Sequence, residues 1–395
     1  MNLVDPLPAG TDVVVIGGGV IGAATAFFTS RAGLDVLVLE RRPAVCSLTT
    51  AVAGGGYRLQ QDNERDYRMV EESLEILSGF AELTGQQRYD PEIRPQGYLW
   101  LTGNEAGAGR QRRVVEVQRT WGLDDVDVLD GDATRAAFPF VSPDVIQARF
   151  RRGDGFLDPK AVTMGFLEGS GAGIKVNCGV IGLDPGGDGR VEVRTMAGVV
   201  AADAVIIAAG PFSGTVAAMA GLDLPVTAVR RQKLVMPEIP EVPAGAPMTI
   251  DEDTGAHWRP DFAGATVFFT DPDTPPSPPA EEVPLDHSFV FRVLDPGSPV
   301  GLARVAPFWR DVWERGSDPW VLQAGQYTMT PDRKPLIGPA GHGIWVNTGY
   351  CGHGVMCSAA GGRHLADTLS GKISPDENPY RLDRSIEPEP HLDPL

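Results

Sequence analysis

The sequence predicts an α/β fold in which helices cover a parallel sheet, and three stretches of the chain indicate it. Residues 12–40 have the pattern of a strand, a glycine-rich turn, a helix and a second strand. Residues 202–210 are an apolar strand that ends in small residues. Residues 343–369 repeat the order of strand, glycine-rich turn and helix. Apolar strands that alternate with helices are typical of sheets buried on both faces.

The first of these stretches has the order of a nucleotide-binding turn. The β-branched run 13–16 fits a buried strand, and residues 20–32 fit an apolar helix that ends at Gly33. Residues 36–39 form the next strand. Between the first strand and the helix stands G-x-G-x-x-G, formed by Gly17, Gly19 and Gly22. This order predicts a Rossmann-type dinucleotide site.

Each residue of the motif has a physical task. Gly17 permits the tight turn, Gly19 lets a pyrophosphate approach the backbone, and Gly22 lets the helix pack closely on the sheet. The helix N-terminus offers free N–H groups to the phosphates. Glu40, at the end of the second strand, is placed to accept hydrogen bonds from a ribose 2′-hydroxyl. A carboxylate there repels a 2′-phosphate, which disfavours NADP.

The later stretches favour FAD over NAD. The strand 202–210 can join the same sheet, so that a long cofactor passes over its end. The turn after 343–348 can aim a second helix, 355–369, at the cofactor. A cofactor that both ends of so long a chain contact is an extended one. No second G-x-G-x-x-G is placed to build a separate NAD(P)H domain.

Composition excludes several classes of function. The chain has 395 residues, and 34 basic against 52 acidic residues give a net charge of −18. This balance argues against nucleic-acid binding and against docking on anionic membranes. The four cysteines do not have zinc-ligand spacing, so no metal centre is expected. Without a signal-peptide pattern or a long apolar run, we expect a cytoplasmic protein with no membrane span.

Four further motifs carry a resemblance to a known family. GDGFLDPKAV at 153–162, DAVIIAAGPFSG at 203–214, AGQYTMTPDRKPLIGP at 324–339 and the following GYCGHGV are similar to those of the D-amino-acid oxidase (DAO) superfamily. The sarcosine, dimethylglycine and proline oxidase and dehydrogenase branch fits best. The resemblance covers nearly the whole chain and is weakest over 225–320.

This resemblance implies a fold that is α+β overall. A Rossmann-type FAD-binding domain of three-layer ββα architecture is interleaved with a substrate domain built on a large mixed or antiparallel sheet. The FAD-binding domain is expected from residues 1–85, 153–225 and 325–395. The substrate domain is expected from residues 86–152 and 226–324.

The resemblance also implies the reaction. A C–N bond of an amine or N-alkyl amino acid is oxidised by hydride transfer to flavin N5, and water then hydrolyses the imine. Either O2 or another acceptor reoxidises the flavin, and the sequence does not decide between oxidase and dehydrogenase. The expected partner is a small amine or amino-acid-like substrate. Its identity, its stereochemistry and the oligomeric state stay open.

The candidate catalytic residues are Arg58, His257 and Tyr327. Arg58 follows three glycines that permit close approach, His257 is expected on a roof strand over the flavin, and the Tyr327 phenol can hydrogen-bond substrate. We expect the cofactor to be contacted by Gly17, Gly19, Val20, Ile21, Gly22, Glu40, Arg41, Thr49, Thr50, Gly55, Arg58, Val180, Ala209, Gly210, Gly325, Gly352, His353, Gly354 and Val355.

The sequence departs from the family's pattern at positions that bind FAD and at positions that bind the substrate. Relatives that bind FAD covalently use a cysteine at the position of Gly325 or a histidine within the stretch that matches 48–53, and neither is present. FAD is therefore expected to be non-covalent. Cys351, near the expected flavin, is interpreted as a buried structural thiol.

The basic residues that bind the substrate carboxylate in simple sarcosine oxidases align with Gln61 and Met356. Tyr327 stands where glycine oxidase-like members have an arginine. Either Arg58 or another residue replaces this clamp, or the substrate is larger or less charged. The lysine that promotes oxygen reduction in some relatives aligns with Phe268. Lys233 is a candidate replacement, but an exposed strand residue is the favoured interpretation.

Two other functions remain open. The same fold can oxidise a 2-hydroxy acid or another alcohol, with His257 as the base that takes the hydroxyl proton. Alternatively, the protein is a flavin-binding electron-transfer subunit without catalysis of its own. The proline-rich segment 271–284 is interpreted first as a solvated loop, with an active-site lid or a partner surface as alternatives.

Overall fold

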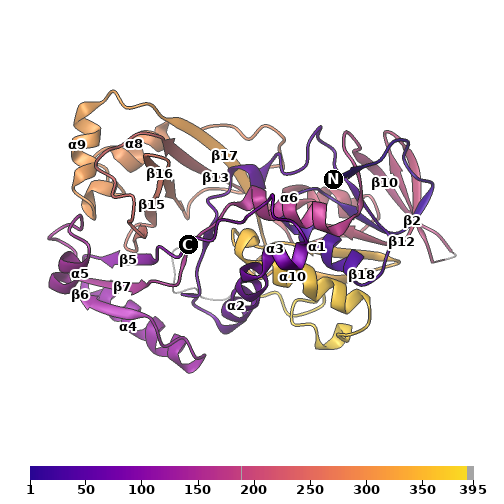
Figure 1. The fold of residues 1–395 in the computed structure, drawn as a ribbon, viewed down its shortest axis with the longest axis horizontal. Helices are drawn as coiled ribbons and strands as arrows, with labels where there is room; N and C mark the ends of the chain where they lie inside the picture. Colours follow the sequence, from indigo (N-terminus) through magenta and orange to yellow (C-terminus); the bar gives the residue numbers. More distant parts are fainter. Residues whose placement is uncertain (188, 389–395) are drawn as a thin grey trace.

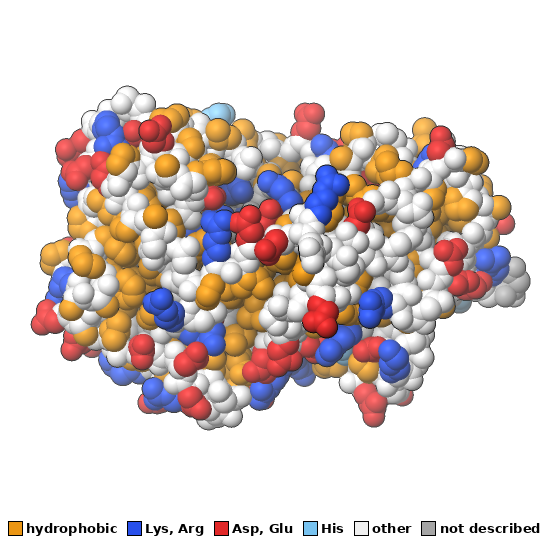
Figure 2. All heavy atoms as spheres, in the orientation of Figure 1, with side chains coloured by type: hydrophobic (Ala, Val, Ile, Leu, Met, Phe, Trp, Pro, Cys, Tyr) orange, Lys and Arg blue, Asp and Glu red, His pale blue; other side chains and the backbone are white. Residues whose placement is uncertain are grey.

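The computed structural model describes residues 1–187 and 189–388. Figure 1 shows two halves, each built around a sheet, with strands β13 and β17 between them. The α/β prediction is confirmed, because both sheets are mixed and helices pack on each. Acidic and basic side chains are interspersed over the face drawn in Figure 2.

The first sheet is the predicted parallel one. In the described residues its order is β1-β9-β3-β2-β12-β11-β10, and β19 also pairs with β12 and carries β18 at its other edge. From β1 to β12 the neighbouring strands are parallel. Its strands are β1 (Asn2–Leu3), β2 (Gly10–Ile16), β3 (Val36–Leu39), β9 (Gly173–Lys175), β10 (Val180–Pro185), β11 (Val191–Thr195), β12 (Gly198–Ile207), β18 (Leu336–Gly341) and β19 (Ile344–Thr348).

Alternating side chains divide this sheet into two buried faces. Val13, Val15 and Ile206 pack against helices, whereas Val14, Ile16 and Ile207 pack on residues of the β10–β12 meander. This is the expected three-layer ββα arrangement. The helical layer consists of α1 (Val20–Arg31), α2 (Glu64–Ser78), α3 (Phe80–Thr84), α6 (Pro159–Ser170) and α10 (Gly354–Leu369).

The second sheet is mixed, as the resemblance implies. Among the described residues its order is β17-β13-β16-β15-β14-β5-β7-β6, and only β14 and β5 are parallel. Its strands are β5 (Tyr98–Thr102), β6 (Asp127–Asp130), β7 (Gln147–Arg151), β13 (Thr227–Met236), β14 (Met248–Asp251), β15 (Ala256–Asp261), β16 (Gly264–Phe269) and β17 (Val321–Met329).

One face of this second sheet is closed by short helices. Trp258 and Leu234 are buried there with Trp309 and Val293, which lie on α9 (Phe308–Arg315) and α8 (Ser288–Leu294). The opposite face is left to cover a cavity. The remaining elements are α4 (Glu105–Thr120), α5 (Gly131–Ala137), α7 (Ser213–Ala218), β4 (Gly56–Tyr57), β8 (Gly155–Phe156) and the short 3-10 turns η1 (Thr49–Val52), η2 (Gly210–Phe212), η3 (Leu302–Arg304) and η4 (Pro375–Glu377).

The element boundaries agree closely with the predictions. Strand 36–39 is found as predicted, and helices α1 and α10 differ from the predicted ranges by one residue each. Strand β12 begins at Gly198, before the predicted residue 202, and ends at Ile207, before the predicted residue 210, where the chain enters the 3-10 turn η2. The domain ranges stay a prediction, and β17 runs unbroken across the predicted boundary at residue 325. In the described part of the chain, no helix is long and apolar enough to cross a membrane.

Candidate active site

A cavity of about 630 Å³ lies at the carboxyl ends of β2, β3 and β12, beneath the open face of the second sheet. This edge of an open α/β sheet is where such folds bind ligands. Residues of the stretches 16–58, 178–219 and 323–356 line it. Every residue predicted to contact cofactor or substrate lines this cavity except Gly22.

Gly22 acts instead by letting α1 approach the turn. A Cβ on Gly22 would lie 1.9 Å from the carbonyl oxygen of Gly17. Gly17 itself has a φ of +116°, and a Cβ there would lie 2.5 Å from the carbonyl oxygen of Ala208. Both glycines are therefore required for the close contact among β2, β12 and α1.

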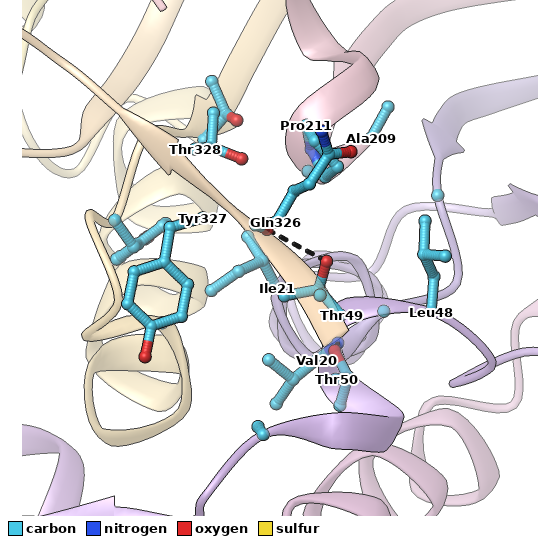
Figure 3. Close-up of a pocket in the computed structure, with 18 of the residues that line it drawn as sticks. Val20, Ile21, Leu48, Thr49, Thr50, Ala209, Pro211, Gln326, Tyr327 and Thr328 are labelled. Atoms are coloured by element: carbon cyan, nitrogen blue, oxygen red, sulfur yellow. Dashed lines mark hydrogen bonds between the residues drawn. The ribbon is translucent and has the colours of Figure 1, made fainter. Parts of the chain in front are cut away.

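The N-terminus of α1 opens into the cavity. Its N-cap residue, Gly19, makes no side-chain cap, and the Val20 N–H donates to Thr50 Oγ1 at 3.1 Å. Since the Thr50 hydroxyl accepts this bond, its own hydrogen is available to a phosphate oxygen. Figure 3 shows that the Thr49 hydroxyl instead donates to the Gln326 carbonyl of β17, at 3.1 Å. Thr49 therefore ties η1 to β17 and cannot also donate to a ligand.

Backbone groups fix the carboxylate of Glu40 at the end of β3. Oε2 accepts from the Gly18 N–H at 2.9 Å, and Oε1 accepts from the Arg42 N–H at 2.8 Å. The next residue, Arg41, stacks on the ring of Phe212, with its guanidinium carbon 4.5 Å from the ring centroid. The predicted ribose-binding acid is thus held in one orientation beside the glycine turn.

A second helix N-terminus reaches the far end of the cavity. Helix α10 starts at Gly354, and its N-cap residue His353 makes no side-chain cap. Gly352 has a φ of +97° and lies under the Tyr327 ring, which a Cβ at Gly352 would approach to 2.5 Å. The positive end of the α10 dipole therefore faces the cavity, as predicted.

The roof strand β15 places His257 over the cavity. Its Nδ1 lies 2.9 Å from the Gly255 carbonyl oxygen, which can only accept, so Nδ1 carries the hydrogen and Nε2 the lone pair. The ring stacks on Phe268, with centroids 5.0 Å apart. Burial lowers the pKa of His257 to about 4. The imidazole is therefore neutral near pH 7 and a weak base.

Arg58 lies deep in the cavity wall, with only 3% of its surface exposed. It donates to the Gln60 carbonyl and lies over Trp100, 5.1 Å from the ring centroid. The buried Asp154 anchors this segment, because its carboxylate accepts from the Leu59 N–H at 2.8 Å and from Gln60 Nε2 at 3.0 Å. Arg58 is therefore held by a preformed buried network.

Tyr327 points into the cavity, on the opposite side of β17 from Gln326 (Figure 3). Burial raises the pKa of Tyr327 above its usual value, so its phenol stays protonated near neutral pH and can donate a hydrogen bond.

The two residues that align with the usual carboxylate clamp are neighbours in space. Gln61 Nε2 lies 3.6 Å from Met356 Sδ and donates to the Arg58 carbonyl at 2.8 Å. This pair is neutral and satisfied within the protein. Cys351 is buried, its Sγ accepts from the Thr330 N–H at 3.3 Å, and burial raises its thiol pKa. That environment fits an unreactive structural thiol.

The interpretation of Lys233 as an exposed residue is wrong. It is partly buried, lines the cavity and stands opposite Phe268 in the β13–β16 register. Sequence reasoning also missed Arg231, which lines the cavity opposite Gly325. Alternation along TAVRRQKLVM places 231 and 233 on one face, but the sequence does not show which face is open.

The proline-rich segment 271–284 is a strap that runs beside β13, where the Ser277 N–H donates to the Ala228 carbonyl at 2.8 Å, and a side chain of β17 holds it there. The Gln326 amide donates to Ser277 Oγ and the Pro278 carbonyl, at 3.0 and 2.8 Å, and accepts from the Ala280 N–H at 2.8 Å. Glu281 then forms ion pairs with Arg41 and Arg42, next to Glu40. None of its residues is buried, so the segment is a solvated loop as first interpreted, and its hydrogen bonds and ion pairs hold part of it against the protein.

Comparisons with known proteins agree on one family. The family model described as DAO, FAD dependent oxidoreductase, matches residues 12–368. The mitochondrial dimethylglycine dehydrogenase of Mus musculus is 26% identical over 388 residues, which cover 91% of this chain and 42% of that protein. FAD-dependent oxidoreductase domain-containing protein 1 of Xenopus laevis is 28% identical, covering 92% of this chain and 79% of that protein.

The fold is also that of solved structures. L-proline dehydrogenase from P. horikoshii superposes with a TM-score of 0.82 at 23% identity, covering 97% of this chain and 100% of that one. The chain spans less than half the length of the dimethylglycine dehydrogenase that it matches.

Proposed function

Since the chain belongs to the DAO family of FAD-dependent oxidoreductases, we propose that it oxidises a C–N bond of an amine or N-alkyl amino acid. The observation that carries this proposal is the single cavity that joins the glycine turn of α1 to a chamber bounded by Arg58, His257 and Tyr327. Relatives named as dimethylglycine and sarcosine dehydrogenases support the C–N bond as the reacting group.

The residues present fit FAD. Gly17 permits the tight turn, and the N-cap Gly19 has no side chain to cap the first turn of α1. Apart from the Val20 N–H, which donates to Thr50, the N–H groups of this turn can donate to a pyrophosphate. Glu40 is oriented to accept from a ribose, and Thr50 retains a hydroxyl hydrogen for a phosphate oxygen. The N-terminus of α10 lines the same cavity and would supply the positive end of its dipole to a bound flavin.

When bound, the flavin supplies a two-electron acceptor for the hydride that leaves the carbon next to the amine nitrogen. The protein's own groups bind and orient the substrate. Tyr327 is protonated and donates from β17, and the neutral His257 accepts at Nε2 from the roof. The buried Arg58 contributes a fixed positive charge to the wall. Water completes the reaction by hydrolysing the imine.

The low basicity of His257 favours amine oxidation over alcohol oxidation. A general base works best when its pKa lies near the working pH, and burial lowers that of His257 to about 4. We propose further that FAD is non-covalent, that O2 or another acceptor reoxidises it, and that the protein is cytoplasmic. The absence of a cysteine at Gly325 and of a histidine within 48–53 supports the first of these.

The test is a visible spectrum followed by anaerobic additions of amines and hydroxy acids. We expect a yellow protein whose flavin is bleached by secondary or tertiary amines and released by acid precipitation. Bleaching by hydroxy acids alone would support the alcohol reaction. Bleaching by a partner protein alone would support an electron-transfer subunit. A colourless protein, with no flavin bound after incubation with FAD, contradicts the proposal. Peroxide formed on admitting air distinguishes oxidase from dehydrogenase.

The strap predicts slow cofactor release. Glu281→Gln removes the charge that joins the strap to Arg41 and Arg42, beside the expected ribose site. Because exposed ion pairs contribute roughly 0.2–1 kcal/mol, we expect flavin to dissociate about two to five times faster. Flavin fluorescence during dilution measures this rate. The matched control is Glu282→Gln, which removes the same charge from the neighbouring exposed residue. Equal rates for the two variants would show that the strap does not retain the cofactor.

A further inference from the structure

Two basic side chains occupy the cavity face of β13, where no family clamp aligns. Arg231 and Lys233 are separated by one residue, so both point to the same side of the strand, roughly 7 Å apart along it. Their cross-strand partners are Gly325 for Arg231, and Gln323 and Phe268 for Lys233. None of these partners carries a charge.

Neither cation forms an ion pair with a carboxylate of the described residues. Arg231 Nη1 donates to the Arg230 carbonyl at 3.1 Å, and its buried Nε has no hydrogen-bond partner in the described part of the chain. Lys233 Nζ donates to the Ala53 carbonyl at 3.4 Å. Desolvation lowers the pKa of both groups, that of Lys233 to about 8. Because both side chains are partly buried and neither forms an ion pair with a carboxylate of the described residues, an anionic ligand between them is favourable.

The acids nearest to Arg231 and Lys233 are Asp271 and Asp261, and each of them forms an ion pair with another arginine, Arg292 and Arg259 respectively. Among the described residues that line the cavity, Glu40 is the one carboxylate, and backbone N–H groups hold it at the glycine turn. The β13 side of the cavity instead carries Arg231 and Lys233. Two neighbouring cations at a cavity wall favour an anionic ligand.

From this placement, and resting on the proposed function, we propose that the substrate is an amine that carries two carboxylates. Arg231 binds one carboxylate with its guanidinium fork, and the Lys233 ammonium binds the second. The neutral pair Gln61 and Met356 plays no part in anion binding. In this protein the carboxylate-binding residues are therefore on β13, and Lys233, the second cation, distinguishes dicarboxylates from monocarboxylates.

Unreactive anions test this without turnover. Calorimetric titration of the purified protein compares malonate, succinate and glutarate with acetate, propionate and butyrate. We expect the best dicarboxylate to bind at least about tenfold more tightly than any monocarboxylate, as one added charge-assisted hydrogen bond would give. Equal affinity for the two series overturns the proposal even if amines bleach the flavin. Selective binding of dicarboxylates without bleaching by any amine would support the two-carboxylate site on β13 but would overturn the amine as its substrate.

Variants then assign the two contacts. Arg231→Gln is expected to weaken the best dicarboxylate about 100-fold, and Lys233→Met to abolish the difference between the two series. Arg230→Gln is the matched control, because Arg230 lies on the other face of β13 and pairs with Asp286. The affinity of this variant for the best dicarboxylate should stay within about twofold of the wild-type value. A Lys233→Met protein that keeps dicarboxylate affinity but reoxidises more slowly in air would contradict the assignment of Lys233. Thermal unfolding checks that each variant is folded. The comparison of dicarboxylates with monocarboxylates on the wild-type protein tests the proposal even if a variant does not fold.

Discussion

Replacing Gly22 with alanine is expected to weaken flavin binding strongly. The new Cβ would lie 1.9 Å from the Gly17 carbonyl oxygen, a backbone atom that no side-chain rotation can move away. Helix α1 would have to shift outward, and the N–H groups at its start would leave the position that the pyrophosphate needs. Forcing atoms into packed sites costs about 1–3 kcal/mol and occasionally more, and the same energy taken from flavin binding is a loss of affinity of about 5- to 150-fold.

The ratio of flavin to protein after gel filtration measures this effect. Gly109→Ala is the control, because Gly109 also lies within a helix, α4, and its nearest neighbour is the flexible end of Arg113 at 3.5 Å. That variant should retain full flavin and should be at least as stable as the parent. A Gly22→Ala protein with full flavin would contradict this prediction, because it would show that the Gly17 turn can rearrange around the added Cβ without losing the cofactor site.

Among the substitutions proposed for this protein, Asp154→Ala is expected to lower the free energy of unfolding the most. The carboxylate is completely buried and accepts from the Leu59 N–H, from Gln60 Nε2 and from Arg151 Nη1, the last at 2.8 Å. Alanine would leave these donors unsatisfied in the interior and would release the segment that carries Arg58. Removing one partner of a buried ion pair costs about 3–5 kcal/mol.

Denaturant unfolding gives the free energy of unfolding for this comparison. Asp125→Ala is the matched control, since Asp125 is the other acid that Arg151 contacts, at 2.6 Å, but it is 59% exposed. We expect a loss of at most about 1 kcal/mol for that exposed pair. Similar losses for the two variants would mean that the buried network does not hold the Arg58 segment.

Local signals made the cofactor half of the molecule predictable. The glycine turn, the β-branched run before it and Glu40 lie within thirty residues of each other, and each has a steric or electrostatic reason to be there. The boundaries of α1, β3 and α10 therefore follow the predicted ones within one residue. Glu40 and the open helix ends could be assigned without any knowledge of distant contacts.

The substrate half depends on contacts between distant parts of the chain. Arg231 and Lys233 reach the cavity because β13 pairs with β16 and β17 in one register, and a shift of one residue would turn both away. Asp154 acts on a loop 95 residues earlier in the chain, and Glu281 acts on the turn at residue 41. Asp154 lies within the motif at 153–162 and Glu281 within the proline-rich segment, but neither pattern shows which distant residue the acid contacts. Side-chain type alone could therefore not reveal these roles.

Strand β17 belongs to both ligand environments at once. It holds Gly325 against Val52 and Thr49 of the cofactor-facing turn, and two residues later it presents Tyr327 to the substrate chamber. A ligand that draws the roof inward therefore acts directly on the turn beside the flavin. Thermodynamic linkage makes the effect reciprocal. If bound substrate raises the affinity for flavin by some factor, bound flavin raises the affinity for substrate by the same factor. Strand β17 therefore couples the binding of flavin to the binding of substrate.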